Sequence, residues 1–277
     1  MNVARDSDLL YGKKKGAEGK MRVCAIQMDV TKGDRAANHA AVRRFAVEAK
    51  SLCSPDVIVL PELWSTGYAL EQASELADEL GDAAFLGGLA CELGTSFAGG
   101  SVLAEEGGKF FNRAQVIDRA GRYTASYDKI HLFCLMDEDR FLAPGSRLSL
   151  FDAGGLRCTS VICYDIRFCE LPRRLAVEGA ECLFVSAEWP IPRTEHWRTL
   201  LRARAIENQM FVAACNRCGV TEGTEFAGHS ALIAPDGTVL AEAGKDEEII
   251  WADFDPEQVR RTRAQIPVFA DRVPELY

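Results

Sequence analysis

The chain has 277 residues, with 32 Lys and Arg against 41 Asp and Glu, which gives a formal net charge of −9. A protein that mainly binds nucleic acid or an anionic membrane surface needs the opposite sign, so both classes are excluded as principal functions. Hydrophobic residues make up 48% and charged residues 26% of the sequence, as in ordinary globular proteins. A chain of this length buries enough surface to be stable without a disulfide or metal ion.

The ten cysteines are scattered along the chain, mostly within apolar runs, and do not form the dense pattern of a disulfide framework. Residues 1–20 contain three consecutive lysines, Lys13–Lys15, but no apolar stretch typical of a signal peptide. No apolar run approaches the ~18 residues that a membrane span requires. We therefore expect a cytoplasmic protein with reduced thiols, in which 1–20 is a disordered arm or was added by cloning.

Between residues 21 and 277, short apolar runs alternate with amphipathic stretches. In chain order the sequence predicts strands and helices as follows: strand 22–28, helix 38–51, strand 56–60, helix 82–93, strands 95–104, 109–118 and 122–127, strand 157–163, helix 171–178, strand 182–186, helix 194–208, strand 211–215, a hairpin of 226–234 with 238–243, and strand 249–254. No linker, charge block or repeat interrupts this order, so we expect one α/β domain over 21–277 with helices on its outer faces.

Three ionisable residues follow buried strands, where a sheet holds side chains rigidly beside a crevice. Glu62 stands at the end of an apolar run, and a partly desolvated carboxylate in such a place suits general-base chemistry. Lys129 follows a strand and could stabilise an oxyanion. Cys163 ends an apolar strand just before a helix, where a thiol can become a nucleophile.

Each of these patterns alone has a simpler explanation. Glu62 could cap a loop, Lys129 could be a surface lysine with a buried stem, and Cys163 could be an inert core thiol. The combination of all three in one order is more specific than any of them singly.

The order Glu–Lys–Cys and its surroundings resemble the nitrilase superfamily of carbon–nitrogen hydrolases. The resemblance covers about residues 21–277 and depends on three motifs: Leu60-Pro61-Glu62, Asp128-Lys129-Ile130-His131-Leu132-Phe133 and Cys163-Tyr164-Asp165-Ile166-Arg167-Phe168. It implies a single-domain, four-layer α-β-β-α sandwich. One position departs from the usual family pattern, since Cys169 stands where relatives usually have proline, at the start of a helix.

Later segments are similar to the omega-amidase branch of that superfamily, whose bacterial members are linked to methionine salvage. They are 188–190, 196–201, 203–209, 214–217, 225–230 and 266–269. This similarity implies hydrolysis of the side-chain amide of a small 2-oxo dicarboxylic monoamide, 2-oxoglutaramate, to 2-oxoglutarate and ammonia. It also implies a homodimer or higher homo-oligomer.

The resemblance assigns the roles of the catalytic residues. Cys163 is expected to be the nucleophile that forms a thioester, and Glu62 the proton carrier. Lys129 and the backbone N–H of Tyr164 would bind the oxyanion, and Glu138 would orient Lys129 and Glu62. This arrangement is chemically reasonable, because an amide carbonyl is a poor electrophile whose oxyanion must be stabilised. Hydrolysis needs only water, so no cofactor and no metal are expected.

Aromatic, acidic and basic residues near these motifs are expected to bind the substrate: Tyr68, Phe133, Glu188, Trp189 and Arg193. Arg193 or Arg140 could hold a substrate carboxylate in a bidentate pair. Trp189 follows a strand end and could line the pocket, since aromatic walls are usual there.

Other functions remain open from the residues alone. The chain could be another carbon–nitrogen hydrolase, such as an N-carbamoyl amino-acid amidohydrolase, an aliphatic amidase or a nitrilase. It could also be a non-enzymatic, cysteine-rich metal or redox protein, because Cys215 and Cys218 form a C-x-x-C, although no second pair completes a zinc site. His131, His196 and His229 invite a Cys–His model, but His131 fits a packed, hydrogen-bonded residue better.

Overall fold

Two six-stranded sheets form the centre of the protein in a computed structural model that describes residues 19–276. The predicted arm 1–20 lies outside the described residues except for Gly19 and Lys20. The strands of the first sheet are, in spatial order, β14 (Glu248–Phe254), β1 (Met21–Gln27), β2 (Val57–Val59), β3 (Ser96–Glu106), β4 (Lys109–Ile117) and β5 (Tyr123–Asp128). The strands of the second sheet are β13 (Val239–Glu242), β12 (Ala231–Ile233), β9 (Phe211–Asn216), β8 (Cys182–Ala187), β7 (Leu156–Ile162) and β6 (Leu150–Ala153).

Each sheet has a parallel centre and antiparallel edges. Strands β1, β2 and β3 are parallel in the first sheet, and β7, β8 and β9 are parallel in the second. A two-stranded ribbon of β10 (Val220–Thr221) and β11 (Thr224–Glu225) lies outside both sheets. Parallel neighbours need crossover connections, which explains why helices separate these strands in the sequence.

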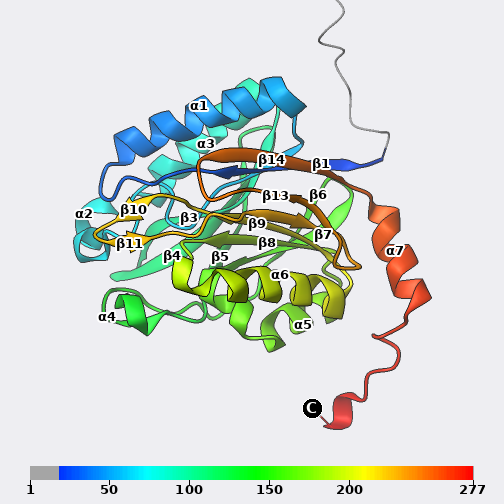
Figure 1. Cartoon of the computed structure of the whole chain (residues 1–277). Helices are drawn as coiled ribbons and strands as arrows, with labels where there is room; N and C mark the ends of the chain where they lie inside the picture. The colour runs from blue at the N-terminus through cyan, green and yellow to red at the C-terminus, as the bar shows by residue number, and fades with distance from the viewer. Residues whose placement is uncertain (1–18, 277) are drawn as a thin grey trace, which may run out of the picture.

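Helices cover the outer face of each sheet, as Figure 1 shows. Helices α1 (Arg35–Cys53) and α3 (Glu79–Leu93) pack on the first sheet, and α5 (Glu170–Val177) and α6 (Thr194–Asn208) pack on the second. A separate apolar cluster fills the space between the sheets, where the rings of Phe211 and Phe254 stack at 4.2 Å. The predicted four-layer α-β-β-α sandwich is confirmed.

The remaining helices are short or lie at the edges of the sandwich. They are η1 (Leu70–Gln72), α2 (Ala73–Leu76), η2 (Cys134–Met136), α4 (Glu138–Phe141), η3 (Cys163–Arg167), η4 (Ile191–Arg193), α7 (Pro256–Gln265) and η5 (Pro274–Leu276). The predicted hairpin strand 226–234 is shorter in the structure, where β12 begins at Ala231. Gly228 and His229 have φ values of 64° and 52°, which an extended strand does not allow.

The parallel strands also decide where the site lies. The carboxyl ends of parallel strands meet at the same edge of a sheet, and ligands of α/β proteins commonly bind there. Glu62 follows β2, Cys163 follows β7 and Glu188 follows β8, so the fold brings the candidate residues toward one end of the sandwich.

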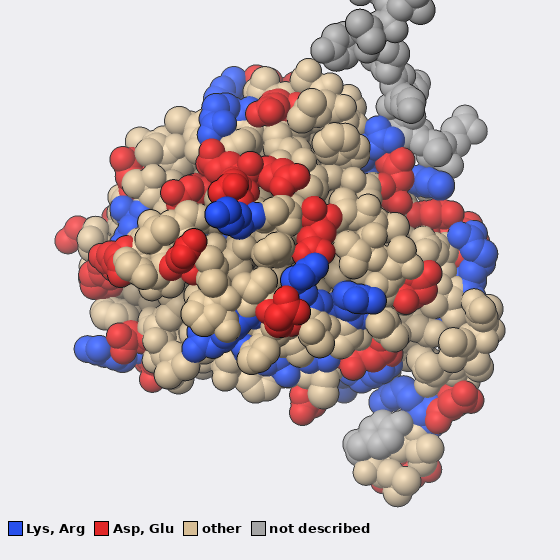
Figure 2. Space-filling view, viewed as in Figure 1, with Lys and Arg blue, Asp and Glu red and all other residues tan. Residues whose placement is uncertain are grey.

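Acidic and basic side chains alternate over the face of the molecule shown in Figure 2. Charge of neither sign occupies this face alone. Over residues 19–276, none of the helices is both long and apolar enough to cross a bilayer. All ten cysteines are free thiols, of which Cys91, Cys134 and Cys169 are exposed and the others buried.

Candidate active site

A buried ammonium lies between two buried carboxylates at this end of the sandwich. Lys129 Nζ is 2.7 Å from Oε1 of Glu62 and 2.6 Å from Oε1 of Glu138. All three side chains are fully buried. Buried charges are stable only when they are paired and hydrogen-bonded. These three side chains meet that condition, because the ammonium lies within hydrogen-bond distance of both carboxylates.

Glu62 accepts further hydrogen bonds that fix its orientation. Its Oε1 accepts from Tyr68 OH at 3.0 Å and from Asn112 Nδ2 at 2.8 Å, and its Oε2 accepts from the backbone N–H of Glu188 at 2.9 Å. Tyr68 OH is also hydrogen-bonded to Glu138. The carboxylate of Glu62 is thereby tied to four separate segments of the chain.

Opposing effects act on the ionisation of the lysine and its second carboxylate. Burial alone would lower the pKa of Lys129, but the charges of Glu62 and Glu138 outweigh it and raise this pKa above its usual range. Burial and the charge of Glu62 raise the pKa of Glu138, and Lys129 opposes this rise. Lys129 therefore stays an ammonium throughout the physiological range.

Cys163 is the first residue of η3 and follows directly after β7. Its φ of 44° is in the left-handed region, which non-glycine residues rarely adopt and which is common at functional sites. Burial and the charge of Glu62 raise the pKa of the Cys163 thiol, while Lys129 acts in the opposite direction. At rest Cys163 is therefore a protonated thiol beside the Glu62 carboxylate.

Asp165 holds the turn of Cys163 against the segment that carries Lys129. Its carboxylate accepts from the backbone N–H of Ile162 at 3.0 Å, from Tyr127 OH at 2.8 Å and from the backbone N–H of His131 at 3.0 Å. The His131 ring is 2.8 Å from the same carboxylate and stacks on Phe168. His131 is therefore the packed, hydrogen-bonded residue that the sequence favoured.

A small cavity opens beside the sulfur of Cys163. Its lining residues come from three segments: Phe133, Cys163, Tyr164, Arg167, Glu188, Trp189, Pro190 and Arg193. Six of these were expected at the site from the sequence, and Arg167 and Pro190 were quoted only as parts of motifs. Tyr68 does not line this cavity, because its hydroxyl group points to the two carboxylates.

Two guanidinium groups stand at this cavity. Arg167 lies 4.6 Å from the ring centroid of Trp189, and Arg193 lies 5.6 Å from that of Phe133. Burial and the charge of Arg193 lower the pKa of Arg167, so the two cations are close enough to interact. Within 19–276 neither of them has an acidic partner, and the side chain of Arg167 is hydrogen-bonded to Nδ1 of His196, at 3.3 Å. Arg140, the other arginine expected to bind a substrate carboxylate, does not line the cavity and pairs with Asp137 on the surface.

A second buried ion pair lies behind the cavity wall. Arg217 Nη1 is 3.1 Å from Oε2 of Glu188, and both side chains are fully buried. Burial raises the pKa of Glu188 to about 7, although Arg217 opposes this rise. Asn112 stood in none of the sequence motifs, and Arg217 belonged only to the segment 214–217 similar to the omega-amidase branch, without an assigned role.

The described residues contain no group of three or more potential metal ligands. Cys215 is buried in β9 and donates to the carbonyl of Ile26 at 3.1 Å. His229 lies 3.2 Å from Glu242. Neither residue lines the cavity beside Cys163.

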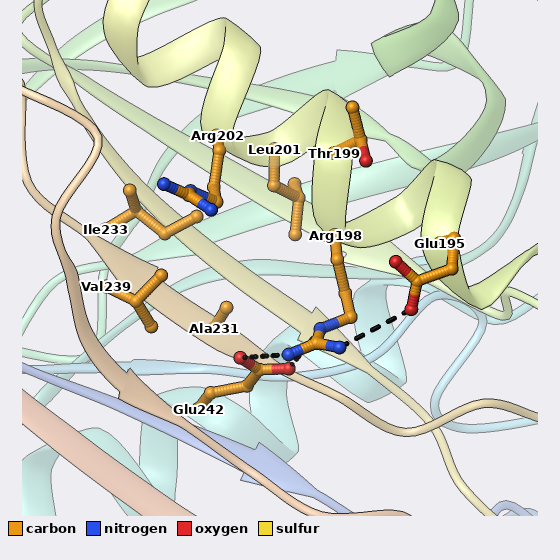
Figure 3. Close-up of a pocket in the computed structure, with 9 residues that line it drawn as sticks. All are labelled: Glu195, Arg198, Thr199, Leu201, Arg202, Ala231, Ile233, Val239 and Glu242. Carbon is orange, nitrogen blue, oxygen red and sulfur yellow. Dashed lines mark hydrogen bonds and ion pairs between the residues drawn. The ribbon is translucent and has the colours of Figure 1, made fainter.

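Another hollow lies between α6 and the strands β12 and β13, as Figure 3 shows. Arg198 crosses it and forms ion pairs with Glu195 and Glu242. Its lining contains no cysteine and no group from the buried triplet. The cavity beside Cys163 is therefore the better candidate for chemistry.

A thiol beside a carboxylate and an ammonium can supply the nucleophile, the base and the oxyanion donor that acyl transfer requires. Comparisons with known proteins agree, since residues 22–264 match the family model described as carbon–nitrogen hydrolase. The chain is 44% identical to a 2-oxoglutaramate amidase of Bacillus subtilis (strain 168), over 93% of this chain and 100% of that relative. It is 32% identical to a human omega-amidase, NIT2, over 92% of this chain and 96% of that relative.

The structural comparison leads to the same family. A carbon–nitrogen hydrolase superfamily protein from Xanthomonas campestris, solved with an arsenic adduct in its active site, superimposes with a TM-score of 0.86 at 30% identity. The alignment covers 92% of this chain and 97% of that structure. The chain belongs to the carbon–nitrogen hydrolase family, and the resemblance seen in its motifs is confirmed.

Proposed function

We propose that this chain is an omega-amidase that hydrolyses the side-chain amide of a small 2-oxo dicarboxylic monoamide, with 2-oxoglutaramate as the expected substrate. The observation that carries the proposal is one cavity lined by a thiol and by two guanidinium groups that have no acidic partner among residues 19–276. Such a cavity suits a short molecule with an amide at one end and a carboxylate at the other. The similarity to a 2-oxoglutaramate amidase supports this choice.

Arg167 and Arg193 are the proposed carboxylate clamp. Two neighbouring cations repel each other, and an anion between them relieves the repulsion and can accept hydrogen bonds from both. Phe133 and Trp189 lie against these guanidinium groups and form apolar walls for the carbon chain of the substrate.

The first half of the reaction forms a thioester. Glu62 takes the proton of the Cys163 thiol as the sulfur attacks the amide carbonyl, and the tetrahedral oxyanion is held by Lys129 and the backbone N–H of Tyr164. The C–N bond then breaks, and the nitrogen leaves as ammonia with the proton returned by Glu62. The acyl group stays on Cys163.

The second half releases the acid. Glu62 takes a proton from water, the resulting hydroxide attacks the thioester carbonyl, and the same donors hold the second oxyanion. The C–S bond breaks, and the proton on Glu62 returns to the sulfur. Glu138, Tyr68 and Asn112 are positioning residues, because they touch Glu62 or Lys129 and do not line the cavity.

Ammonia release from 2-oxoglutaramate tests this function directly. We expect turnover by the wild type and none by Cys163→Ala, while Cys134→Ala, which changes an exposed thiol, retains full activity. Denaturing mass spectrometry of rapidly quenched enzyme should show the acyl adduct on the peptide that contains Cys163. Side-by-side kinetics with an N-carbamoyl amino acid, an aliphatic amide and a nitrile complete the test. A tenfold higher kcat/KM for one of these would assign the chain to that other activity.

Three broader features belong to the same proposal. A cytoplasmic location with reduced thiols fits the ten free cysteines. A homodimer fits the exposed apolar residues on the layer of α5 and α6, among them Val177 and Ile206. A place in methionine salvage is implied by the resemblance to the bacterial branch, and growth of a deletion strain on methionine precursors would test it.

A further inference from the structure

One carboxylate at the cavity has no part in the mechanism above. Glu188 lines the cavity together with Cys163, and its side chain is fully buried. Its Oε2 is taken by Arg217, but its Oε1 has no hydrogen-bond partner in the part of the chain that is described. A buried carboxylate oxygen without a donor is costly, and such an atom at a cavity wall is a place for a donor supplied by a ligand.

Arg217 is fixed and cannot turn to serve this oxygen. Its Nη2 donates to Asp29 at 2.6 Å, to the carbonyl of Val30 at 2.8 Å and to Thr221 at 3.0 Å. Its Nε donates to the carbonyl of Cys218 at 3.1 Å. With Oε2 of Glu188 tied to this rigid group, Oε1 is the oxygen of this cavity-lining residue that lacks a donor among the described residues.

The position of Glu188 relates this atom to the reacting group. Its backbone N–H donates to Oε2 of Glu62, and Glu62 is the carboxylate hydrogen-bonded to the thiol of Cys163. Glu188 therefore lies next to Glu62, the proposed base, and itself lines the cavity beside the sulfur of Cys163. In a 2-oxo acid amide at neutral pH, the carboxylate and the two carbonyl groups are acceptors, and only the amide nitrogen carries N–H groups.

We propose that Oε1 of Glu188 accepts a hydrogen bond from the N–H of the scissile amide and thereby selects primary amides over esters and nitriles of the same acid. This inference deepens the proposed function and depends on Cys163 being its nucleophile. A site built to pair with a substrate N–H discriminates strongly against analogues that lack it, because its own buried polar atom is then left without a partner.

Glu188→Gln tests the role with little change of shape. In this variant Arg217 donates to the amide oxygen of the glutamine. The glutamine Nε2 group then faces the substrate N–H groups, so the proposed acceptor for the substrate amide is lost. The probes are the 2-oxo monoamide and the monomethyl ester of 2-oxoglutarate at the carboxyl that the amide replaces. Both substrates give the same thioester on Cys163. We expect kcat/KM for the amide to fall about 10- to 100-fold, as for a lost charged hydrogen bond, and kcat/KM for the ester to change less than threefold.

Glu195→Gln is the matched control, because Glu195 is an exposed residue of α6. It should leave both substrates unchanged. An equal loss on amide and ester in Glu188→Gln would show that Glu188 only supports the structure, and it would overturn the proposal.

The wild type alone provides a second measurement, which does not depend on the variant folding. The ionisable groups that act on Glu188 come from three segments: Arg217 after β9, Glu62 and Tyr68 after β2, and Lys129 after β5. The pKa of Glu188 is raised to about 7, so Oε1 is an acceptor above that pH and can carry a proton below it. The amide-to-ester ratio of kcat/KM should therefore be highest near pH 8 and should fall toward pH 6.

Ionisation of the thiol affects both substrates and cancels in this ratio. Protonation assists the departure of ammonia more than that of an alcohol. This effect alone would raise the amide-to-ester ratio of kcat/KM toward pH 6, opposite to the expected fall. A ratio that stays constant or rises toward pH 6 would overturn the proposal. Cys163→Ala separates the proposed function from the proposed role of Glu188. Both activities should be lost in this variant, and turnover of either substrate would contradict the proposed mechanism whatever the result for Glu188.

Discussion

Several hydrogen bonds fix the orientation of Glu62, the proposed proton carrier. It accepts from Lys129, Tyr68 and Asn112 on one oxygen and from the Glu188 N–H on the other. A base locked in this way needs no reorganisation as the proton moves, and preorganisation of this kind is a large part of enzyme catalysis.

Tyr68→Phe should lower kcat about tenfold and leave KM within threefold. The change removes one hydroxyl group that donates to both Glu62 and Glu138, so the base keeps its charge but loses part of its orientation. Steady-state ammonia release measures the effect. Tyr123→Phe is the control, since the Tyr123 hydroxyl is bonded to Glu79 in a partly exposed position. A change confined to KM would instead make Tyr68 a substrate-binding residue.

Glu138→Gln should reduce kcat about 10²- to 10³-fold, the scale seen when an oxyanion donor is lost or misplaced. Glutamine keeps the volume and can still accept from the Phe133 N–H, but it no longer holds the Lys129 ammonium by charge. The measurement is kcat with saturating amide, and the neighbouring exposed Asp139→Asn should behave as the wild type. Full activity in Glu138→Gln would contradict an orienting role.

At the residue scale, the sequence predicted the side chains that stand in motifs after strands. Lys129, Glu62 and Glu138 come together as expected. Asn112 and Arg217 were not predicted, because one sits within a strand and the other within a loop, and their partners are distant in sequence. Tyr68 was expected at the substrate, but the path of the chain after β2 directs it to the carboxylates.

The turn of Cys163, where β7 meets η3, depends on Asp165, which is fully buried. Asp165→Asn keeps the size of the side chain but loses acceptor capacity for the donors of Ile162, Tyr127 and His131. We expect a loss of about 1–3 kcal/mol in the free energy of unfolding, and a lower kcat because Cys163 shifts relative to Lys129. Urea unfolding and ammonia release test the two effects, with the exposed Asp246→Asn as control. A stability equal to that of the wild type would disprove this account of the turn.

Elements with a clear apolar period were predicted within a few residues, and α6 matches its predicted range, 194–208. Helix α7 was missed because it is mostly charged and buries only Pro256 and Val259, although Asp255 as N-cap and proline in the first turn are start signals. Strand β6 was missed because it has only four residues, at the edge of its sheet.

The proposed dimer involves the whole molecule. Ile206 on α6 is 50% exposed and Leu240 on β13 is 39% exposed, and both offer apolar surface that the partner subunit of the proposed dimer would cover. Sedimentation of the wild type should give twice the chain mass of 30.4 kDa. Ile206→Glu should shift the protein toward monomer, whereas Leu52→Glu, an equally exposed site on α1, should not. A wild type that sediments as a monomer at micromolar concentration would contradict the proposal.

The distribution of thiols has a practical consequence. Only Cys91, Cys134 and Cys169 are accessible from outside, so a bulky maleimide dye should label these positions first and leave turnover intact. Storage without reductant should crosslink molecules through the same surface positions. Replacing these three with serine would give a preparation that resists such crosslinking and keeps only the buried thiols, Cys163 among them.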